Sequence, residues 1–227
     1  METTFFMRLL TLLCIGLFGL THSHCGDSGK TSVPRCDTTC LKDTIQFVAD
    51  HPTTPKVAIV PTECRADTLL WSYEGLGVLR KISLKFVLKK DIPLQASNAR
   101  CIFDGNKKAF LLFNDCGTGR GYQIKLPFDK RESISIRNKS INSIDPKFSI
   151  NPNLIAYTDQ GNIFVEHTQK GTIAMMTFGE ELPIDHDHIH EYIDSVNITS
   201  ERIWVRVKIQ NKWKELEKSI ELESIDK

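Results

Sequence analysis

An almost strict alternation of apolar and polar residues is the feature that most constrains the fold of this chain. From Lys81 to Lys89, and again from Arg202 to Ile209, every second residue is apolar. This period places one side of a β-strand in a core and the other side in solvent. Turn sequences rich in Gly, Asn and Asp separate these and several other short apolar runs. The sequence therefore predicts an all-β fold built mostly of antiparallel meanders.

The best-formed unit extends from Asp145 to Gly179. It contains Pro-Lys-Phe-Ser-Ile, Asn-Leu-Ile-Ala-Tyr-Thr-Asp, Asn-Ile-Phe-Val-Glu-His and Thr-Ile-Ala-Met-Met-Thr-Phe-Gly, four short strand sequences joined by tight turns. This unit resembles one blade of the TolB-type periplasmic β-propeller repeats. The resemblance implies a small or partial propeller-like fold, and looser units from Ala99 to Arg137 and from Asp194 to Leu222 fit a blade-like repeat. A β-sandwich accounts for the same strands and is the alternative.

Two further segments fit either a helix or a strand. Apolar residues between Asp37 and Asp50 have helical spacing, although the second half of this segment also fits a strand. The segment from Lys212 to Leu222 has the same ambiguity, and pairing with the strand before it is the alternative to a helix.

The first 25 residues have the order of an export signal. An apolar run from Leu9 to Leu20 is followed by small and polar residues. The run is shorter than the roughly 20 apolar residues that a bilayer-spanning helix needs. We predict an export signal peptide at residues 1–24, a flexible tether at 25–35, and a single β-rich domain at 36–227. The hydrophobic fraction of 41% is sufficient for a core in that domain.

The exported chain is either lipidated at Cys25 or released as a secreted protein. Cys25 follows the apolar run and precedes Gly-Asp-Ser-Gly-Lys, a small, polar and partly acidic sequence. This arrangement resembles the exported lipoproteins of Bacteroidetes-like bacteria. The resemblance implies that Cys25 is lipidated and holds the chain on a membrane without spanning it, in the periplasm or on the outer membrane. The alternative is cleavage near Ser23 or Cys25 and release of a secreted protein.

The remaining cysteines of the expected domain all lie between residues 36 and 116. An oxidising compartment favours disulfides over free thiols or a metal site. Lipidation of Cys25 leaves five cysteines and therefore one without a partner, whereas an unlipidated Cys25 allows three bridges. Cys101 and Cys116 bracket an expected hairpin, so we predict a bridge between them. The disulfide candidates are Cys36, Cys40, Cys64, Cys101 and Cys116.

One short segment is dense in potential metal ligands. Imidazole and carboxylate groups together suit zinc or another divalent transition metal. Histidines spaced two apart share one face of a strand, and those spaced four apart share one face of a helix. The alternative is a solvated loop following Pro183. The candidate ligands are Asp185, His186, Asp187, His188, His190 and Glu191.

Three other sequence features are candidates for a functional site. The Gly-Thr-Gly-Arg-Gly sequence at residues 117–121 predicts a hairpin loop from which Arg120 can reach an anion, since no helix follows to bind phosphate. Two N-glycosylation sequons begin at Asn138 and Asn197. Trp71, Tyr73, Trp204 and Trp213 can form a carbohydrate-stacking surface, and cross-strand aromatic pairing is the alternative.

The sequence favours a non-enzymatic binding or structural module of the cell envelope. Its partner is expected to be an envelope protein, with membrane contact through the lipid anchor only. The net charge of +1, with interspersed charges, argues against nucleic acid. The alternatives are an exported metal-dependent enzyme that uses the Asp185–Glu191 segment, and a secreted, disulfide-bonded glycoprotein.

Overall fold

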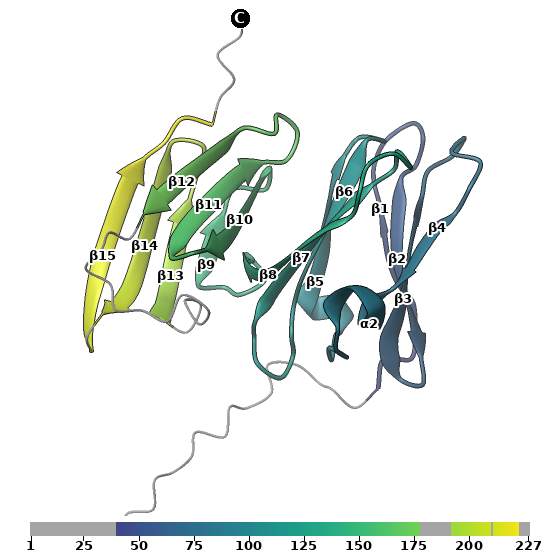
Figure 1. Cartoon of the computed structure of the whole chain (residues 1–227), viewed down its shortest axis with the longest axis horizontal. Helices are drawn as coiled ribbons and strands as arrows, with labels where there is room; N and C mark the ends of the chain where they lie inside the picture. The colour runs from purple at the N-terminus through teal and green to yellow at the C-terminus, as the bar shows by residue number, and fades with distance from the viewer. Residues whose placement is uncertain (1–39, 178–191, 210, 223–227) are drawn as a thin grey trace, which may run out of the picture. The chain divides into compact units, whose positions relative to one another are not determined.

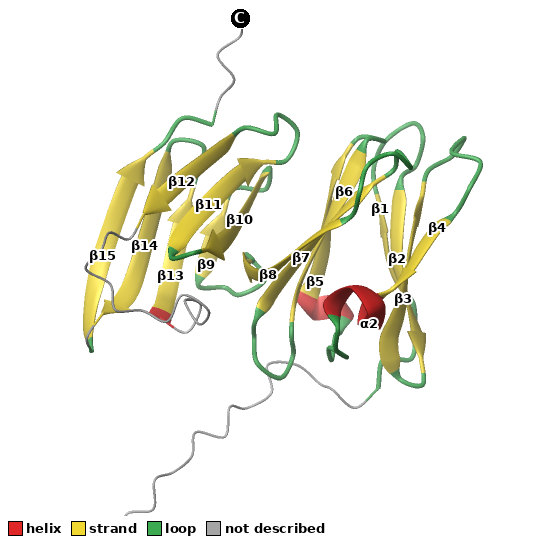
Figure 2. Cartoon of the chain, viewed as in Figure 1, coloured by secondary structure: helices red, strands yellow, loops and turns green. Residues whose placement is uncertain are grey.

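A computed structural model describes residues 40–177, 192–209 and 211–222 of the chain. Contacts divide the chain into Met1–Val33 and Pro34–Lys227, and everything described below belongs to the second unit. Within it, strands form three sheets (Figure 1). A short helix, α2 (Leu84–Leu88), and a 3₁₀ turn, η1 (Ala96–Asn98), interrupt the strands (Figure 2). The all-β prediction is therefore confirmed for the described residues.

The first sheet, sheet A, is a four-stranded antiparallel meander in chain order. Its strands are β1 (Ile45–Val48), β2 (Lys56–Thr62), β3 (Arg65–Ser72) and β4 (Arg80–Ser83). The ambiguous segment between Asp37 and Asp50 thus contributes a strand. The β2–β3 turn places Glu63 and Cys64 at positive φ, as a tight hairpin turn requires.

The second sheet, sheet B, contains seven strands in the order β12-β11-β10-β8-β7-β6-β5, and all of its pairings are antiparallel. Its strands are β5 (Ala99–Asp104), β6 (Lys108–Asn114), β7 (Gly121–Pro127), β8 (Ser135–Ile141), β10 (Leu154–Asp159), β11 (Asn162–His167) and β12 (Ile173–Thr177). The register shifts between β7 and β8 at Gly121 and Gln123. Such a bulge increases the local twist of a sheet.

The third sheet, sheet C, has the order β15-β14-β13-β9. Its strands are β9 (Phe148–Ile150), β13 (Ile193–Ile198), β14 (Arg202–Ile209) and β15 (Lys212–Ser219). The alternation predicted from Arg202 to Ile209 is confirmed, because Ile203, Val205 and Val207 are fully buried. The segment after Lys212 forms a strand rather than a helix.

The unit from Asp145 to Gly179 contains the four expected strands, β9 to β12, but they do not form one sheet. Strands β10, β11 and β12 form an antiparallel meander in sheet B. Strand β9 instead pairs in parallel with β13 of sheet C, with Ser149 opposite Asn197. The TolB-type resemblance stays a prediction.

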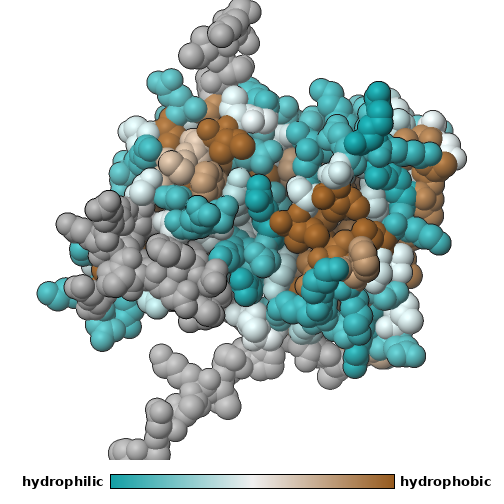
Figure 3. Space-filling view, in the orientation of Figure 1, coloured by the Kyte–Doolittle hydropathy of each residue, from teal (hydrophilic) through white to brown (hydrophobic). Residues whose placement is uncertain are grey.

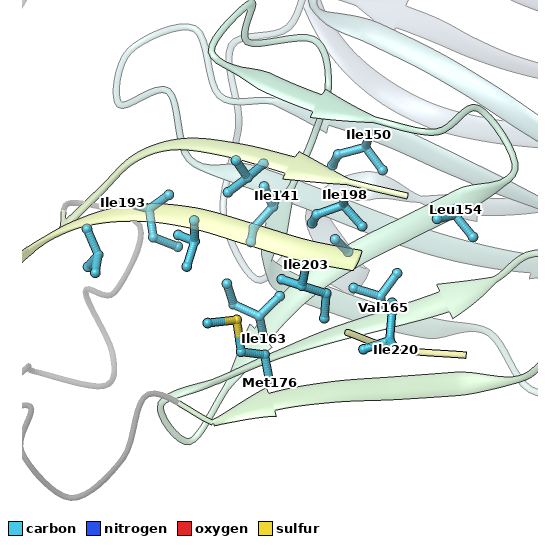
Figure 4. Close-up of a cluster of buried hydrophobic side chains, with 14 of the residues drawn as sticks. Ile141, Ile150, Leu154, Ile163, Val165, Met176, Ile193, Ile198, Ile203 and Ile220 are labelled. Atoms are coloured by element: carbon cyan, nitrogen blue, oxygen red, sulfur yellow. The ribbon is translucent and has the colours of Figure 1, made fainter. Parts of the chain in front are cut away.

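Two large cores lie between facing sheets. One is formed by sheet A together with β5, β6 and β7, and includes Ile59, Trp71, Leu111 and Ile124. The other is formed by sheet C together with β10, β11 and β12. Figure 4 shows labelled side chains of this second core, such as Ile163 and Ile203, between the strands of the two sheets. Face-to-face packing of two sheets is the arrangement of the sandwich alternative.

The prediction of a strand from Lys81 to Lys89 is wrong for the second half of that segment. Residues up to Ser83 belong to β4, but Leu84–Leu88 forms α2. The Ser83 hydroxyl accepts a hydrogen bond from the Phe86 backbone N–H at 3.4 Å, as an N-cap does, and Lys89 ends the helix in a left-handed conformation. Leu84 is buried while Phe86 is exposed, so the apolar residues do not share one face.

Candidate functional site

A disulfide joins the start of the described chain to the β2–β3 turn. Cys40 and Cys64 are bonded, and the Leu41 backbone N–H donates to the Cys64 carbonyl at 3.0 Å. The bond therefore attaches the segment that precedes β1 to sheet A. Both residues were among the disulfide candidates.

The predicted bridge between Cys101 and Cys116 is wrong. Cys101 has a free thiol, and Cys116 is disulfide-bonded to another residue. Cross-strand register explains the error, because Cys101 lies opposite Leu111 in the middle of the β5–β6 pair. Cys116 follows the end of β6 and is therefore displaced along the sheet. Desolvation raises the pKa of the Cys101 thiol, which favours its protonated form.

Three buried asparagines form a polar cluster beside Cys116. The Asn142 Nδ2 donates to the Asn114 Oδ1 at 2.8 Å and to the Phe113 carbonyl at 3.0 Å. The Asn98 Nδ2 donates to the Asn114 carbonyl and to the Cys116 Sγ, the latter at 3.1 Å. This asparagine cluster (Asn98, Asn114 and Asn142) connects η1, β6 and the residue that follows β8.

A cleft of about 410 Å³ opens next to the asparagine cluster. Asn98, Asn114 and Cys116 line it on one side, and Ile144 and Lys147 contribute from the β8–β9 connection. The backbone comes close here, because a Cβ on Gly121 would lie 2.0 Å from the Ser140 carbonyl oxygen. The sequence does not predict this cluster, since nothing in the spacing of the three asparagines indicates that they meet.

The outer face of sheet C is the most distinctive exposed surface among the described residues. Opposed residues in an antiparallel pair share a face of the sheet. Trp204 lies opposite Glu217, Arg206 opposite Glu215, and Lys208 opposite Trp213. Each of these β14 residues alternates with a buried core residue, so all six side chains lie on the side away from the core. We call this surface the sheet C face; Ser195 and Asn197 extend it onto β13.

Charges and aromatic rings are interleaved on the sheet C face. The Arg206 guanidinium lies 5.3 Å from the centre of the Trp213 ring, and the Lys208 ammonium lies 5.8 Å from it. Arg206 also lies 3.8 Å from the Asp194 carboxylate. Trp213 nevertheless remains 48% exposed. The cation contacts therefore orient the ring without covering it.

The four-aromatic stacking surface expected from the sequence is not formed. Trp71 is 1% exposed, and its indole N–H donates to the Pro127 carbonyl at 2.9 Å inside the first core. Tyr73 makes an edge-to-face contact with Phe128. Trp204 and Trp213, in contrast, share the sheet C face. The alternation from Arg202 to Ile209 was the signal that indicated the outward orientation of Trp204.

Other exposed apolar side chains are distributed over several elements. Figure 3 shows apolar patches interrupted by hydrophilic side chains on the face drawn there. Isolated exposed apolar residues are normal on soluble domains and indicate no particular function. The large exposed apolar residues are Val48, Val78, Leu79, Phe86, Ile173, Met175 and Trp213.

The glycine-rich loop at residues 117–121 connects β6 to β7, as expected for a hairpin. Its Gly119 N–H donates to the Asp115 carbonyl at 2.7 Å. The Arg120 Nε donates to the Asn138 carbonyl of β8 at 2.7 Å. Arg120 therefore connects the loop to the neighbouring strand in this structure. Asn138 itself is exposed, and Asn197 is partly buried on the sheet C face.

The proposed metal ligands Asp185, His186, Asp187, His188, His190 and Glu191 lie outside the described residues, as do Cys25 and Cys36. Within the described ranges, no group of three or more His, Cys, Asp or Glu side chains is arranged to hold a metal ion. The same ranges contain no helix long and apolar enough to cross a membrane. A divalent metal site in the 185–191 segment stays a prediction.

No family model, no curated protein and no solved structure matches this chain.

Proposed function

We propose that this protein is an exported, lipid-anchored binding module of the cell envelope, and that it contacts an envelope protein through the sheet C face. The observation that supports this proposal is the composition of that face. Tryptophan and arginine are the residues most enriched at the energetic centres of protein interfaces. Here Trp204, Arg206 and Trp213 lie on one face of sheet C, and Glu215 and Glu217 lie beside them.

Orientation of the side chains also supports a binding role. Arg206 and Lys208 both contact the Trp213 ring, whose other side is exposed to solvent. These contacts restrict the rotamers of Trp213 before a partner binds. Prior ordering lowers the entropic cost of association. A protein surface offering a hydrophobic contact for Trp213 and opposite charges for Arg206 and Glu215 would complement this face.

Site-directed photo-cross-linking tests the binding role. A photoreactive phenylalanine analogue is placed at Trp213 in the full chain expressed in its own host, and at the matched control position Gln46. Gln46 is exposed on the outer side of sheet A, opposite Ala58. We expect a discrete cross-linked envelope protein from position 213 that is absent from position 46, and reduced cross-linking after Arg206→Ala. Identical patterns at both positions, or no product at 213, would refute the proposal.

Metabolic labelling tests the anchor. With an alkyne-bearing fatty acid, we expect label on the wild-type chain and complete loss of label in Cys25→Ser, together with release from the membrane fraction. The control is Cys101→Ser, because Cys101 is a free cysteine of strand β5 and its replacement leaves the leader intact. Label that survives in Cys25→Ser would exclude Cys25 as the acylated residue.

A further inference from the structure

Positive charge is concentrated in residues 78–90, which include β4 and α2. This segment, here called the basic edge, contains five lysine or arginine residues and no aspartate or glutamate, although the whole chain has a net charge of only +1. It also carries three of the seven large apolar side chains that are exposed on the described residues, namely Val78, Leu79 and Phe86. Strand β4 is the edge strand of sheet A, and α2 follows it directly (Figure 1). Cationic and exposed apolar side chains thus occur together along one continuous segment.

The helix α2 presents an aromatic ring and a cation to solvent. Its Leu84 is buried, and Val87 and Leu88 pack against the first core. Residues three and four apart lie on the same side of a helix, so these three side chains define its inner side. Phe86 lies on the outer side and is 66% exposed, with the Lys89 ammonium 4.4 Å from the centre of its ring. The core therefore holds α2 in an orientation that keeps Phe86 exposed.

Strand β4 adds a further exposed lysine to the basic edge. The Arg80 guanidinium lies 5.0 Å from the centre of the buried Trp71 ring, and Ile82 packs against the first core. Successive side chains of a strand point to opposite faces. Lys81, between Arg80 and Ile82, therefore lies on the outer face of sheet A, where it is exposed.

Carboxylates compensate only part of this charge. The Lys85 ammonium lies 3.2 Å from the Asp91 carboxylate, and the Lys90 ammonium lies 3.9 Å from that of Asp115. No carboxylate of the described residues forms an ion pair with Lys81 or Lys89. The basic edge thus keeps a positive surface that complements an anionic partner.

The basic edge lies beside the point where the described chain begins. Cys40, the first described residue, is bonded to Cys64 of the β2–β3 turn. Arg65 follows Cys64, and its guanidinium lies 3.5 Å from Asp91, the same carboxylate that Lys85 of α2 contacts. Cys25 precedes Cys40 by fifteen residues, a chain length of at most about 50 Å. An acyl group on Cys25 would therefore keep this part of sheet A within reach of the membrane surface.

We propose that the basic edge is a second membrane contact, which docks on a bilayer containing anionic lipids. The inference rests on the proposed function, because the anchor is what brings the chain to the bilayer, whereas the sequence alone predicted contact through the anchor only. Lys81, Lys85 and Lys89 contact the anionic headgroups, and Phe86 enters the interfacial region between headgroups and acyl chains. A single acyl chain gives only marginal membrane binding, and a polybasic patch is one of the second signals that make attachment stable.

Vesicle flotation tests the basic edge independently of the anchor. The full chain carrying Cys25→Ser, which lacks the proposed acylation site, is purified from its own host. It is mixed with vesicles of phosphatidylcholine alone, or of equal parts of phosphatidylcholine and phosphatidylglycerol. We expect binding to the mixed vesicles only, with an affinity that falls as the salt concentration rises, because salt screens exposed charges.

Substitutions in the same Cys25→Ser chain assign the binding to residues. A lysine near an anionic surface contributes about a fivefold factor to the affinity, so Lys81→Gln combined with Lys89→Gln should weaken binding about 25-fold. Phe86→Ala should weaken binding about tenfold, because its ring no longer buries apolar surface in the interface. The matched control combines Lys170→Gln of the β11–β12 turn with Lys212→Gln of β15, both exposed lysines, and should bind as the parent chain does.

The outcomes separate the basic edge from the anchor. No binding to the mixed vesicles, equal binding to both kinds of vesicle, or equal losses in the lysine variant and its control would overturn the membrane contact, whatever the labelling of Cys25 shows. Binding to soluble polyglutamate but not to vesicles would overturn it in favour of an acidic protein partner. Charge-dependent vesicle binding by a chain that carries no label on Cys25 in its host would support the basic edge and refute the anchor.

Discussion

Replacing Asn142 by alanine should cost this protein a large part of its stability. Asn142 is 1% exposed, and its Nδ2 donates to the Asn114 Oδ1 at 2.8 Å, the Phe113 carbonyl at 3.0 Å and the Tyr122 carbonyl at 3.2 Å. Its Oδ1 accepts a hydrogen bond from the Ser140 hydroxyl at 2.7 Å. One side chain thus connects β6, β7 and β8 where the register shifts.

The expected loss in the free energy of unfolding follows from the polar groups that lose a hydrogen-bond partner. Asn142→Ala removes the donor for the buried Asn114 Oδ1 and the acceptor for the buried Ser140 hydroxyl. Each buried polar group left unsatisfied costs about 1–3 kcal/mol. Ser140 keeps a second acceptor in the Ala156 carbonyl at 3.1 Å, which lowers its share. We expect the free energy of unfolding to fall by about 3 kcal/mol, equivalent to roughly 6–12 °C in Tm for a chain of this size.

Urea titration followed by tryptophan fluorescence measures this change, because Trp71 is buried in the first core and reports its exposure. The matched control is Asn138→Ala, since Asn138 lies on β8, which Asn142 directly follows, and has an exposed side chain. The control should change the free energy of unfolding by less than about 0.5 kcal/mol. If Asn142→Ala falls within that same limit, the asparagine cluster does not stabilise the fold.

Three further predictions follow from the described residues. Gly121→Ala should lower the free energy of unfolding by about 3 kcal/mol in the same titration, because its Cβ would lie 2.0 Å from a backbone oxygen of β8. Replacing Cys40 and Cys64 together by alanine should cost about 3.5 kcal/mol, because their bond closes a loop with a sequence separation of 24. Hydrogen bonds from Arg131 lower the pKa of Asp129 from 3.8 to about 2, so the Asp129 carboxylate stabilises the fold above pH 3.8 and this contribution is lost as the pH falls towards 2. Arg131→Ala should return the Asp129 midpoint, followed by NMR, towards 3.8.

The sequence predicted strands well where alternation and burial agreed. In β14, each apolar residue of the alternating run is buried, because the strand lies over the second core. The same alternation predicted a strand at Leu84–Leu88, where the structure has a helix. There, the Ser83 cap and the left-handed Lys89 favour a helical turn, and local capping outweighs a pattern of only four apolar residues.

Long-range pairing could not be predicted in the same way. The parallel pairing of β9 with β13 joins residues nearly 50 positions apart in sequence, such as Ser149 and Asn197, and no local periodicity encodes it. The prediction of a bridge between Cys101 and Cys116 was wrong for a related reason. Cys101 and Cys116 do bracket a hairpin, but the β5–β6 register places Cys101 opposite Leu111. A bracketing position in sequence is not a cross-strand position in the sheet.

The sheet C face was only partly predictable. The alternation of β14 indicated that Trp204 points outward, and this is what the structure contains. The contribution of β15 was hidden, because the segment from Lys212 onwards also fitted a helix. Only the observed register brings Trp213 opposite Lys208 and close to Arg206. The candidate surface therefore depends on a strand pairing that the sequence left open.

The edge position of β15 indicates how a partner would approach this surface. Exposed edge strands invite pairing with another chain, and lysines on the edge oppose it. Lys212, Lys214 and Lys218 alternate along β15 with the outward-facing residues. The Lys218 ammonium donates to the Met175 carbonyl of β12, the edge strand of sheet B, at 2.8 Å. The lysines thus make the β15 edge unfavourable for strand addition, whereas Trp213 remains exposed on the face. A partner that bound by extending the sheet would cross-link from position 214 rather than from position 213, and we expect the opposite.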